Sequence, residues 1–520
     1  MNIKLLFFLL PLLFLISCEQ TPQQSEYERL GLEEITVDKL QEGYLNGDYT
    51  IQEVTAAYLA RIDEIDKNGP GLNSILTVHS QAMEIAAALD KEFQEGTSRG
   101  KLHGVPVILK DNIDTMDMQT TAGSRFMEGS IPPRDAHIVE LLRDKGAIII
   151  GKANLSEWAN FHSSFSSSGW SSLGGQVKNP YELSRNPCGS SSGSGSAVSA
   201  NLATLAIGTE TNGSIVCPSG ANGVVGFKPT VGLWSRAGII PISYTTDSAG
   251  PMVRTVRDAA ILLGELAGAD DRDAKTEEAV GHIQSDYTQY LNDNGMNGKR
   301  IGFYTSPMGN FFRVDTLMLQ TVRMFEEMGA EIVEIDQISE TNVGGDAFQV
   351  LLYEFKDGLN SYFESLGEDA PVRSIEHLAD LTNEHDDRGR FDRNLIIMAS
   401  EMDGLDNEAY QNALENMLTQ SRERGIDRVM DEHQLDAIIS PTGSPAWKTD
   451  LTLGDNFKLS SSSPSARSGY PIITLPMGTI DGLPVGLSIF GRAWSEPVLL
   501  EIAYAFEQNR GARPVPMFLE

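Results

Sequence analysis

The chain has 520 residues, of which 41% are hydrophobic and 22% charged, and its formal net charge is −32. This composition supports a large buried core in one or two domains and excludes disorder over most of the chain. Sequence-independent nucleic-acid binding needs clustered Lys and Arg, so the negative charge predicts no nucleic-acid partner.

The first residues combine an early cation with a short apolar run. Lys4 precedes the run from Leu5 to Ile16, which is too short for a membrane span and predicts a signal peptide over residues 1–17. The sequence ending in Cys18 resembles a bacterial lipobox. It implies lipidation of Cys18 and an exported lipoprotein of the cell envelope, held on the periplasmic or outer-membrane side by this lipid anchor. Residues 18–35 are then a lipidated cysteine and polar tether; secretion with an incidental Cys18 is the alternative.

Helices and short apolar strands alternate from residue 50 onward. Thr50 and Glu53 have capping-box form ahead of apolar residues at helical spacing, and a second helix is expected near 81–93. The branched apolar run 105–109 predicts a buried strand. Lys110 would therefore lie at the carboxyl end of that strand.

The alternation continues through the second half of the chain. A helix over 136–145 leads into a strand over 147–150, and further strands are expected over 300–304, 330–335 and 437–440. Strands that alternate with helices predict an α/β fold in layers around a largely buried sheet. The section from about 270 to 435 is helical and acidic, and its charge runs are most simply solvated faces.

Between residues 176 and 250 the composition changes to Ser, Gly, Asn and Thr. A flexible linker is the simplest interpretation, but apolar runs at 202–207 and 223–227 interrupt the small residues. Gly-rich and Ser-rich backbone inside a folded α/β protein marks a close approach of main chain to a ligand. We therefore expect a binding site here.

Three elements could together cleave an amide bond, namely Lys110, the serine-rich segment 188–196 and the segment 208–215. Ser214 follows a turn in which Gly213 has no side chain to block converging main-chain N–H groups. A serine nucleophile needs a base. No His occurs in a matching motif, so Lys110 is the remaining strong base once burial lowers its pKa. Asp111 would point to the opposite side of the strand.

The order and spacing of several motifs resemble the amidase-signature family over the whole mature length, and bacterial peptide amidases most of all. The motifs are His103–Gly104–Val105–Pro106 running into Lys110–Asp111, then segments 151–158, 186–193, 208–218 and 226–230. The resemblance implies a single α/β domain over 36–520, a mixed, largely buried β-sheet with helices on both faces. Within it, the variable region of about 270–435 would shape the substrate pocket.

The resemblance also implies roles by position. Lys110 matches the catalytic lysine, Ser190 the bridging serine after an unusual cis peptide bond, and Ser214 the nucleophile. The oxyanion hole maps onto the main-chain N–H groups of Thr211, Asn212, Gly213 and Ser214. The family's common Asp and following Arg are replaced by Glu210 and Val216, which changes pocket shape and charge rather than catalysis.

The implied reaction is hydrolysis of a carboxamide to a carboxylic acid and ammonia through an acyl-enzyme. The expected substrates are peptide or amino-acid amides, with fatty or aryl amides as the alternative. No Cys/His group has zinc spacing, so we expect no metal and no cofactor. Cys188 and Cys217 are predicted to be packed free thiols. Residues 163–170 and Trp234 are candidate pocket walls or core residues.

Other functions explain fewer of these residues. The pattern Gly189–X–Ser191–X–Gly193 also fits a nucleophile elbow of a Ser–His–Asp hydrolase, but the preceding residues are turn-like rather than a strand. The Gly-Lys-Ser/Thr ending of a P-loop is absent from the same loop. A lipid-anchored solute-binding protein would not need the paired serines and lysine. A tRNA-transamidating enzyme would be separated from tRNA by export.

Overall fold

The computed structural model describes residues 25–384 and 390–520. The predicted signal peptide and the predicted lipid attachment at Cys18 lie outside the described residues. Within the described ranges, no helix combines the length and apolar character needed to cross a membrane.

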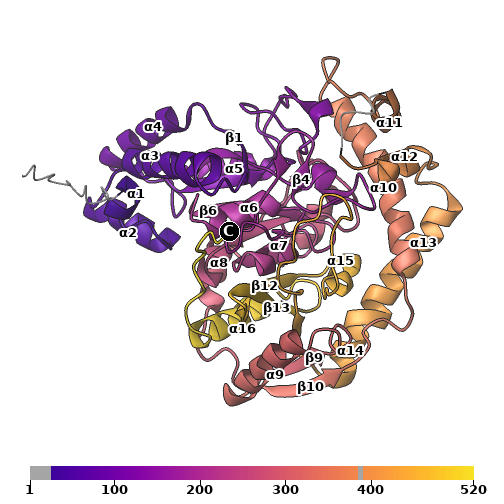
Figure 1. Ribbon diagram of the computed structural model, residues 1–520. Helices are drawn as coiled ribbons and strands as arrows, with labels where there is room; N and C mark the ends of the chain where they lie inside the picture. Colours follow the sequence, from indigo (N-terminus) through magenta and orange to yellow (C-terminus); the bar gives the residue numbers. More distant parts are fainter. Residues whose placement is uncertain (1–24, 385–389) are drawn as a thin grey trace, which may run out of the picture.

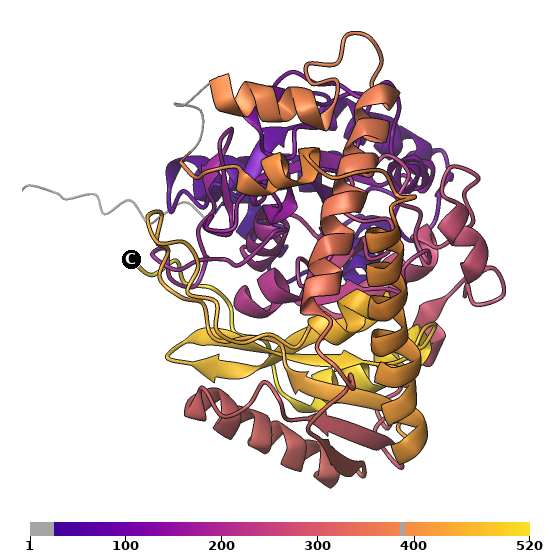
Figure 2. The same ribbon diagram turned by 90° about the vertical axis from the view of Figure 1, so that its right-hand side faces the viewer.

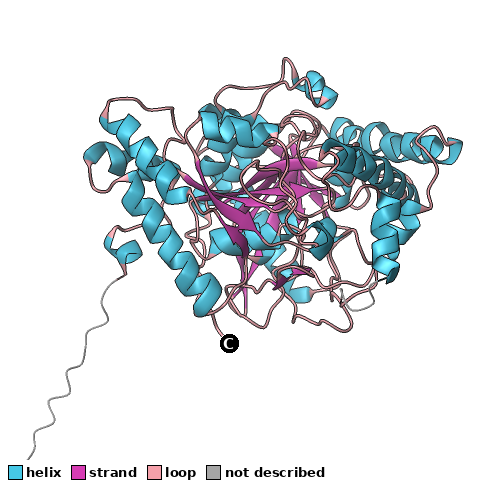
Figure 3. Ribbon diagram, turned by 90° about the horizontal axis from the view of Figure 1, so that it is seen from above, coloured by secondary structure: helices cyan, strands magenta, loops and turns pink. Residues whose placement is uncertain are grey.

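One mixed sheet of 11 strands runs through the molecule, and helices cover both of its faces (Figures 1 and 3). Its strand order is β1-β3-β2-β6-β8-β7-β12-β13-β11-β9-β10. The strands are β1 Ile75–Val78, β2 Pro106–Lys110, β3 Ile148–Ala153, β6 Leu205–Glu210, β7 Val225–Lys228, β8 Ser248–Val253, β9 Arg300–Tyr304, β10 Glu331–Ile335, β11 Ala437–Pro441, β12 Ile472–Ile480 and β13 Leu483–Phe490. The predicted α/β fold with a mixed, largely buried sheet is confirmed.

Parallel pairing is confined to two parts of this sheet. β2 pairs in parallel with β3 and β6, and β9 pairs in parallel with β10 and β11. The other neighbours are antiparallel. Every residue of β2 is buried, because helices cover this part of the sheet on both sides, and the run therefore reads as continuously apolar. Its last residue is Lys110.

The helices agree with the sequence expectations where the apolar spacing was clear. The predicted capping box of Thr50 and Glu53 is present at the start of α3. The helices are α1 Glu26–Arg29, α2 Val37–Asn46, α3 Ile51–Arg61, α4 Ala82–Gln94, α5 His137–Asp144, α6 Ser192–Ser199, α7 Val216–Ala221, α8 Val256–Leu266, α9 Phe312–Glu327, α10 Gly344–Ser365, α11 Ile375–Glu384, α12 Asn394–Ser400, α13 Glu408–Ser421, α14 Asp427–His433, α15 Ser463–Ser468 and α16 Glu496–Asn509.

The predicted tether extends too far into the chain. Ser25 and Glu28 form a capping box around α1, and Tyr27 and Leu32 are buried in the main core. Residues 25–35 are therefore part of the fold, because a short helix with apolar residues on one side can pack onto α3. The Gln-rich composition just before it concealed this helix.

The section from 270 to 435 contributes to two parts of the molecule, the edge of the main sheet and a helical flank. Strands β9 and β10 extend the edge of the main sheet, whereas α10 and α13 run along one flank (Figure 2). Val350 and Tyr353 of α10 pack against Tyr410 and Ala413 of α13 in a small apolar cluster. This flank brings α10 close to the segment after β6, where the predicted site residues lie.

Candidate active site

Lys110 ends β2 with its side chain fully buried among hydroxyl and carbonyl groups. Its Nζ lies 2.7 Å from Ser190 Oγ, 2.8 Å from Thr209 Oγ1 and 3.1 Å from the Thr209 carbonyl oxygen. Asn112 Nδ2 donates to Thr209 Oγ1 at 3.0 Å and so holds this threonine in place. The predicted lysine and the predicted bridging serine are thus in direct contact.

The lysine amine carries no carboxylate partner within contact distance among the described residues. Burial lowers the pKa of Lys110 to about 7, against the opposing charges of Asp247 and Glu210. Asp111 points away, as strand alternation predicts, and lies 3.5 Å from Lys152 Nζ. Asp111 also accepts the Thr121 backbone N–H at 3.1 Å. The neighbouring carboxylate therefore belongs to a separate buried ion pair.

Ser190 lies in the short loop before α6. The Gly189–Ser190 peptide bond is cis, and the Ser190 carbonyl oxygen accepts the N–H of Ser156 at 3.1 Å. A Cβ on Gly189 would lie 2.3 Å from Ser156 Oγ, so only glycine fits there. The loop is therefore pressed against the segment that follows β3.

Ser214 lies in the turn between β6 and α7, beside the Ser190 loop. The N–H of Ser191 donates to the Ser214 carbonyl oxygen at 3.1 Å. Ser214 is 8% exposed. In the described part of the chain, no hydrogen bond joins the Ser214 hydroxyl to Ser190 in this conformation. The two serines are neighbours through their backbones.

The same turn presents main-chain donors that no described residue uses. The N–H groups of Ile215 and Val216 donate to Glu210 Oε2 at 2.8 and 3.0 Å. By contrast, within the described ranges the N–H groups of residues 211–214 donate to no acceptor. Gly213 has φ +83°, a conformation that suits glycine. Glu210 thus caps the start of α7, and the main-chain N–H groups of residues 211–214 are left without an acceptor among the described residues.

The alternative nucleophile Ser191 is in a different environment. Its side chain is fully buried, its Oγ donates to the Thr209 carbonyl oxygen at 3.0 Å, and it accepts the Thr209 N–H at 3.2 Å. No strand precedes it, since residues 184–190 are turn and loop. The geometry of a nucleophile elbow is therefore missing here.

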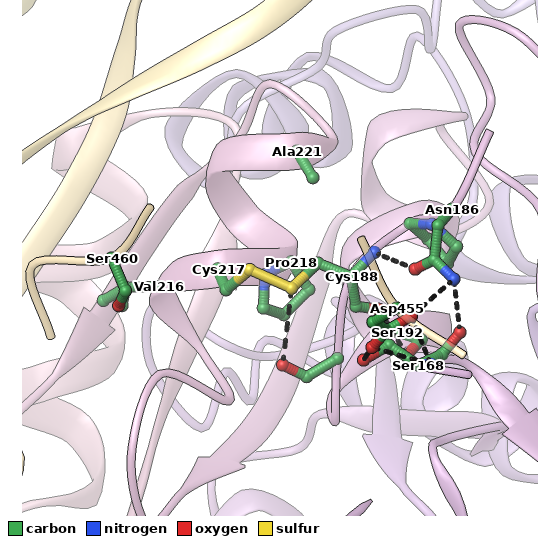
Figure 4. Close-up of a disulfide and its surroundings, with 12 residues drawn as sticks. Ser168, Asn186, Cys188, Ser192, Val216, Cys217, Pro218, Ala221, Asp455 and Ser460 are labelled. Carbon is green, nitrogen blue, oxygen red and sulfur yellow. Dashed lines mark hydrogen bonds between the residues drawn. A yellow bond between two sulfur atoms is a disulfide. The ribbon is translucent and has the colours of Figure 1, made fainter. Parts of the chain in front are cut away.

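Cys188 and Cys217 form a disulfide, with a Cα–Cα distance of 6.0 Å (Figure 4). The prediction of two free thiols is wrong. One cysteine precedes Ser190 by two residues and the other follows Ser214 by three, so segments that bring these serines together also bring the thiols together. Asn186 Oδ1 accepts the Cys188 N–H at 2.8 Å, and the Cys188 carbonyl oxygen accepts Ser192 Oγ at 2.6 Å.

A cavity of about 290 Å³ begins at the open turn. Thr209 and Thr211 form one wall, and α10 contributes Gly358 and Tyr362 to another. α10 lies in the 270–435 region, whose role in shaping a substrate pocket stays a prediction. Trp234 is instead a core residue whose indole N–H donates to the Leu263 carbonyl oxygen at 3.2 Å. None of residues 163–170 lines this cavity.

Sequence reasoning missed two residues that touch the site, Thr209 and Asp247. Thr209 lies in the motif that contains Ser214, but only the structure reveals that its hydroxyl and carbonyl both face Lys110. Asp247 is remote in sequence, and its carboxylate accepts the Thr211 hydroxyl at 2.6 Å. Among the described residues, no group of three or more His, Cys, Asp or Glu is arranged to hold a metal ion.

Comparisons with known proteins show that the chain belongs to the amidase family. The Amidase family model matches residues 53–500. The native peptide amidase of Stenotrophomonas maltophilia superimposes with a TM-score of 0.91 at 45% identity, over 94% of this chain and 99% of that chain. An amidase family protein of Bacillus anthracis superimposes with a TM-score of 0.86 at 34% identity, over 96% of each chain. An Arabidopsis thaliana protein named a probable amidase is 38% identical, over 94% of this chain and 92% of that protein.

These relatives contradict the predicted location. They include a plant amidase and a bacterial peptide amidase, and nothing in the comparison supports an exported protein with a lipid anchor at Cys18. It supports neither a cell-envelope lipoprotein nor the alternative of a lipid-anchored binding protein. The prediction depended on residues 1–18 alone, where an early lysine and an apolar run form a pattern that a short sequence can contain without export.

Proposed function

As a member of the amidase family this chain is an enzyme that hydrolyses C–N amide bonds, and we propose that Ser214, Ser190 and Lys110 carry the reaction. In this proposal Ser214 is the nucleophile, Ser190 passes its proton on, and Lys110 is the base. The observation that carries it is the 2.7 Å contact between Lys110 Nζ and Ser190 Oγ at the buried end of β2, beside the turn that holds Ser214.

The contacts of the amine can accommodate its neutral form as a base. Thr209 offers two acceptors to Lys110, a carbonyl and a hydroxyl oxygen, and these suit the two N–H bonds of a neutral amine. The remaining lone pair then faces the Ser190 hydroxyl. Since burial lowers the pKa of Lys110 to about 7, a large fraction of the amine is neutral near neutral pH.

The open turn supplies the second requirement, stabilisation of negative charge on the carbonyl oxygen. We assign the oxyanion hole to the N–H groups of residues 211–214, which have no other acceptor in the described chain. Fixed backbone donors of this kind cost no reorganisation during the reaction and are typically worth about 3 kcal/mol each. The capping of Ile215 and Val216 by Glu210 keeps the turn in its open shape.

The proposed reaction proceeds in two halves. Ser214 Oγ attacks the amide carbonyl while its proton moves to Ser190, and the Ser190 proton moves to Lys110. As the C–N bond breaks, the same path returns a proton to the nitrogen, which leaves as ammonia. A water then attacks the Ser214 ester by the same relay and releases the carboxylic acid. The proposal needs no metal and no cofactor.

Peptide or amino-acid amides are the proposed substrates. The proposal is supported by the similarity to peptide amidase over nearly the whole of both chains and by the cavity of about 290 Å³ beside the open turn. A volume of about 300 Å³ lies at the lower end of the range for small-molecule sites. Fatty and aryl amides are the competing class.

Ammonia release from a panel of amides tests the proposal. The purified enzyme should turn over dipeptide and amino-acid amides faster than fatty or aryl amides. Ser214→Ala should lower kcat by at least about a thousandfold. Ser184→Ala, which alters an exposed serine, is the matched control and should keep full activity. Preference for fatty or aryl amides would overturn the substrate class, and full activity of Ser214→Ala would overturn the catalytic assignment.

A further inference from the structure

We infer that Asp247 is a positioning residue for the proposed reaction, which anchors the oxyanion turn through Thr211 and acts on Lys110 from a distance through its negative charge. This inference rests on the proposed function and extends it to a residue outside the catalytic motifs. Asp247 lies just before β8, at the wall of the cavity that begins at the turn.

The carboxylate of Asp247 is held by three hydrogen-bond donors. Oδ1 accepts the Thr211 hydroxyl at 2.6 Å, and Oδ2 accepts the N–H groups of Ile242 and Ser243 at 2.7 and 2.9 Å. All three contacts suit an ionised carboxylate, which only accepts hydrogen bonds. Asp247 therefore ties its own loop to the first residue after β6.

Thr211 needs such an anchor because one side of it borders the cavity rather than packed side chains. On the other side, Asn212 Oδ1 accepts Ser462 Oγ at 2.7 Å, which fixes the next residue of the turn. The two bonds hold the first two residues of the turn. Without the bond to Asp247, the N–H of Thr211 is free to tilt away from the position of an oxyanion.

Two carboxylates on other segments, Asp247 and Glu210, oppose the effect of burial on the pKa of Lys110. Burial lowers the pKa of Lys110, and Asp247 and then Glu210 raise it. Asp111 on the same strand faces Lys152 instead. Around Asp247 itself, burial raises the pKa of its carboxyl, and Arg236 counteracts this. The other charged groups near this loop are Asp273, which pairs with Arg236, and Glu354 of α10, which accepts from Ser243 and Thr245.

Two substitutions separate the charge from the hydrogen bond. In Asp247→Asn the amide oxygen can take the two loop N–H groups while its NH₂ donates to the Thr211 hydroxyl, so the charge is lost and the anchor is kept. Thr211→Val removes the hydroxyl and keeps the charge. Asp455→Asn is the matched control, since Asp455 is a half-buried carboxylate that also accepts a serine hydroxyl but does not act on Lys110.

The pH dependence of kcat/KM and the separate values of kcat and KM give the readout. Removing a negative charge near an ammonium lowers its pKa, so Asp247→Asn should move the acid limb to lower pH by roughly one unit. Loss of an oxyanion donor costs about 10²–10³-fold, so Thr211→Val, which only misaligns one, should lower kcat about tenfold. Its KM should stay within about twofold and its acid limb should not move. Asp455→Asn should also leave the limb in place.

A folded Asp247→Asn enzyme whose kcat/KM has the same acid limb as the wild type would overturn the electrostatic role. A Thr211→Val enzyme with the kcat of the wild type would overturn the anchoring role. Thermal unfolding of each variant identifies those that do not fold. Thr211→Ser, which restores the hydroxyl, should recover the kcat that Thr211→Val loses. Retention of activity by Ser214→Ala or Lys110→Met would instead signal failure of the proposed function itself.

Discussion

At the residue scale, the unusual feature is a lysine that is buried at a strand end without a carboxylate in contact among the described residues. Desolvation outweighs the more distant charges of Asp247 and Glu210, which lowers the pKa of Lys110 to about 7. The hydroxyl and carbonyl oxygens around the amine can bind either protonation state. This environment makes the residue usable as a base, whereas an exposed lysine would stay protonated.

The first prediction concerns pH. If the neutral amine is the active form, kcat/KM should rise as pH increases through about 7 and then level off, because the proton is lost in that range. Lys110→Met should lower kcat/KM by about a thousandfold and remove the limb near 7. Initial rates between pH 5 and 9 on a good amide would check this, and a limb that persists in Lys110→Met would contradict it.

The second prediction separates the adjacent serines. Ser190→Ala removes the group between Ser214 and Lys110 and should lower kcat by about 10²–10⁴-fold with little change in stability. Ser191→Ala removes a buried hydroxyl that binds β6 and should cost about 1–2 kcal/mol of unfolding free energy, with activity within about tenfold of wild type. Steady-state kinetics and urea unfolding distinguish the two. The opposite pattern would favour Ser191 as the nucleophile.

Sequence reasoning predicted the residues of this site from motifs, and the structure brings Lys110, Ser190 and the Ser214 turn together. It could not predict that Thr209 would supply two acceptors to the amine, because a threonine within a strand gives no sign of which groups it faces. The contact of Asp247 with Thr211 could not be predicted either, since it depends on the antiparallel pairing of β8 with β6.

At the scale of elements, the two loops that carry the serines are tied covalently. The Cys188–Cys217 disulfide joins the residue before the cis peptide bond to α7, and Asn186 and Ser192 hold the Cys188 end (Figure 4). The prediction of free thiols took into account that both cysteines flank the site, but it did not pair them with each other. Convergence of the serines already implied convergence of the thiols.

The third prediction concerns this bond. A crosslink between residues 29 positions apart stabilises the fold by about 3–4 kcal/mol in the chain-entropy account. Cys188→Ser/Cys217→Ser should therefore lower the Tm by several degrees and reduce kcat more than it raises KM. Reduction of the wild type with dithiothreitol should expose two further thiols and have the same effect. An unchanged Tm after both thiols are exposed would contradict the prediction.

The existence of a strand was easier to predict from sequence than its position among the other strands of the sheet. The apolar runs of β2, β3 and β11 identify buried strands by themselves, because both faces of the sheet are covered. Contacts between distant segments determine that β9 and β10 lie at the far edge of the sheet. The same is true of the approach of α10 to the cavity. No local pattern encodes those contacts.

At the scale of the whole molecule, a buried ion pair joins the helical flank to the central layers. Arg393, just before α12, lies 2.7 Å from Glu157, and its guanidinium lies 4.9 Å from the centre of the Phe126 ring. Both charged side chains are buried. The pair thus connects two segments that are more than two hundred residues apart in sequence.

The fourth prediction follows from this connection. Arg393→Met leaves Glu157 as a buried charge without its cation and should cost about 3–5 kcal/mol. The double variant Glu157→Gln/Arg393→Met should be more stable than Arg393→Met alone, because residue 157 then carries no buried charge without its cation. Urea unfolding of the two variants and the wild type checks the order. A double variant less stable than the single one would contradict it.

Composition and motifs were enough to predict an α/β amidase over most of the chain, and the structure and the relatives bear this out. The location was predicted wrongly, since a short N-terminal pattern was given more weight than the rest of the molecule. Residues 25–35, which were predicted to be part of a tether, belong to the fold.

The most direct measurement is the site and rate of labelling by a fluorophosphonate that mimics the acyl group. Peptide mapping of the wild-type enzyme should find one phosphonylated residue, Ser214, and the labelling rate should increase with pH through about 7. Lys110→Met should slow this labelling by about a thousandfold. Labelling of Ser190 or Ser191 instead, or an unchanged rate at Ser214 in Lys110→Met, would contradict the account.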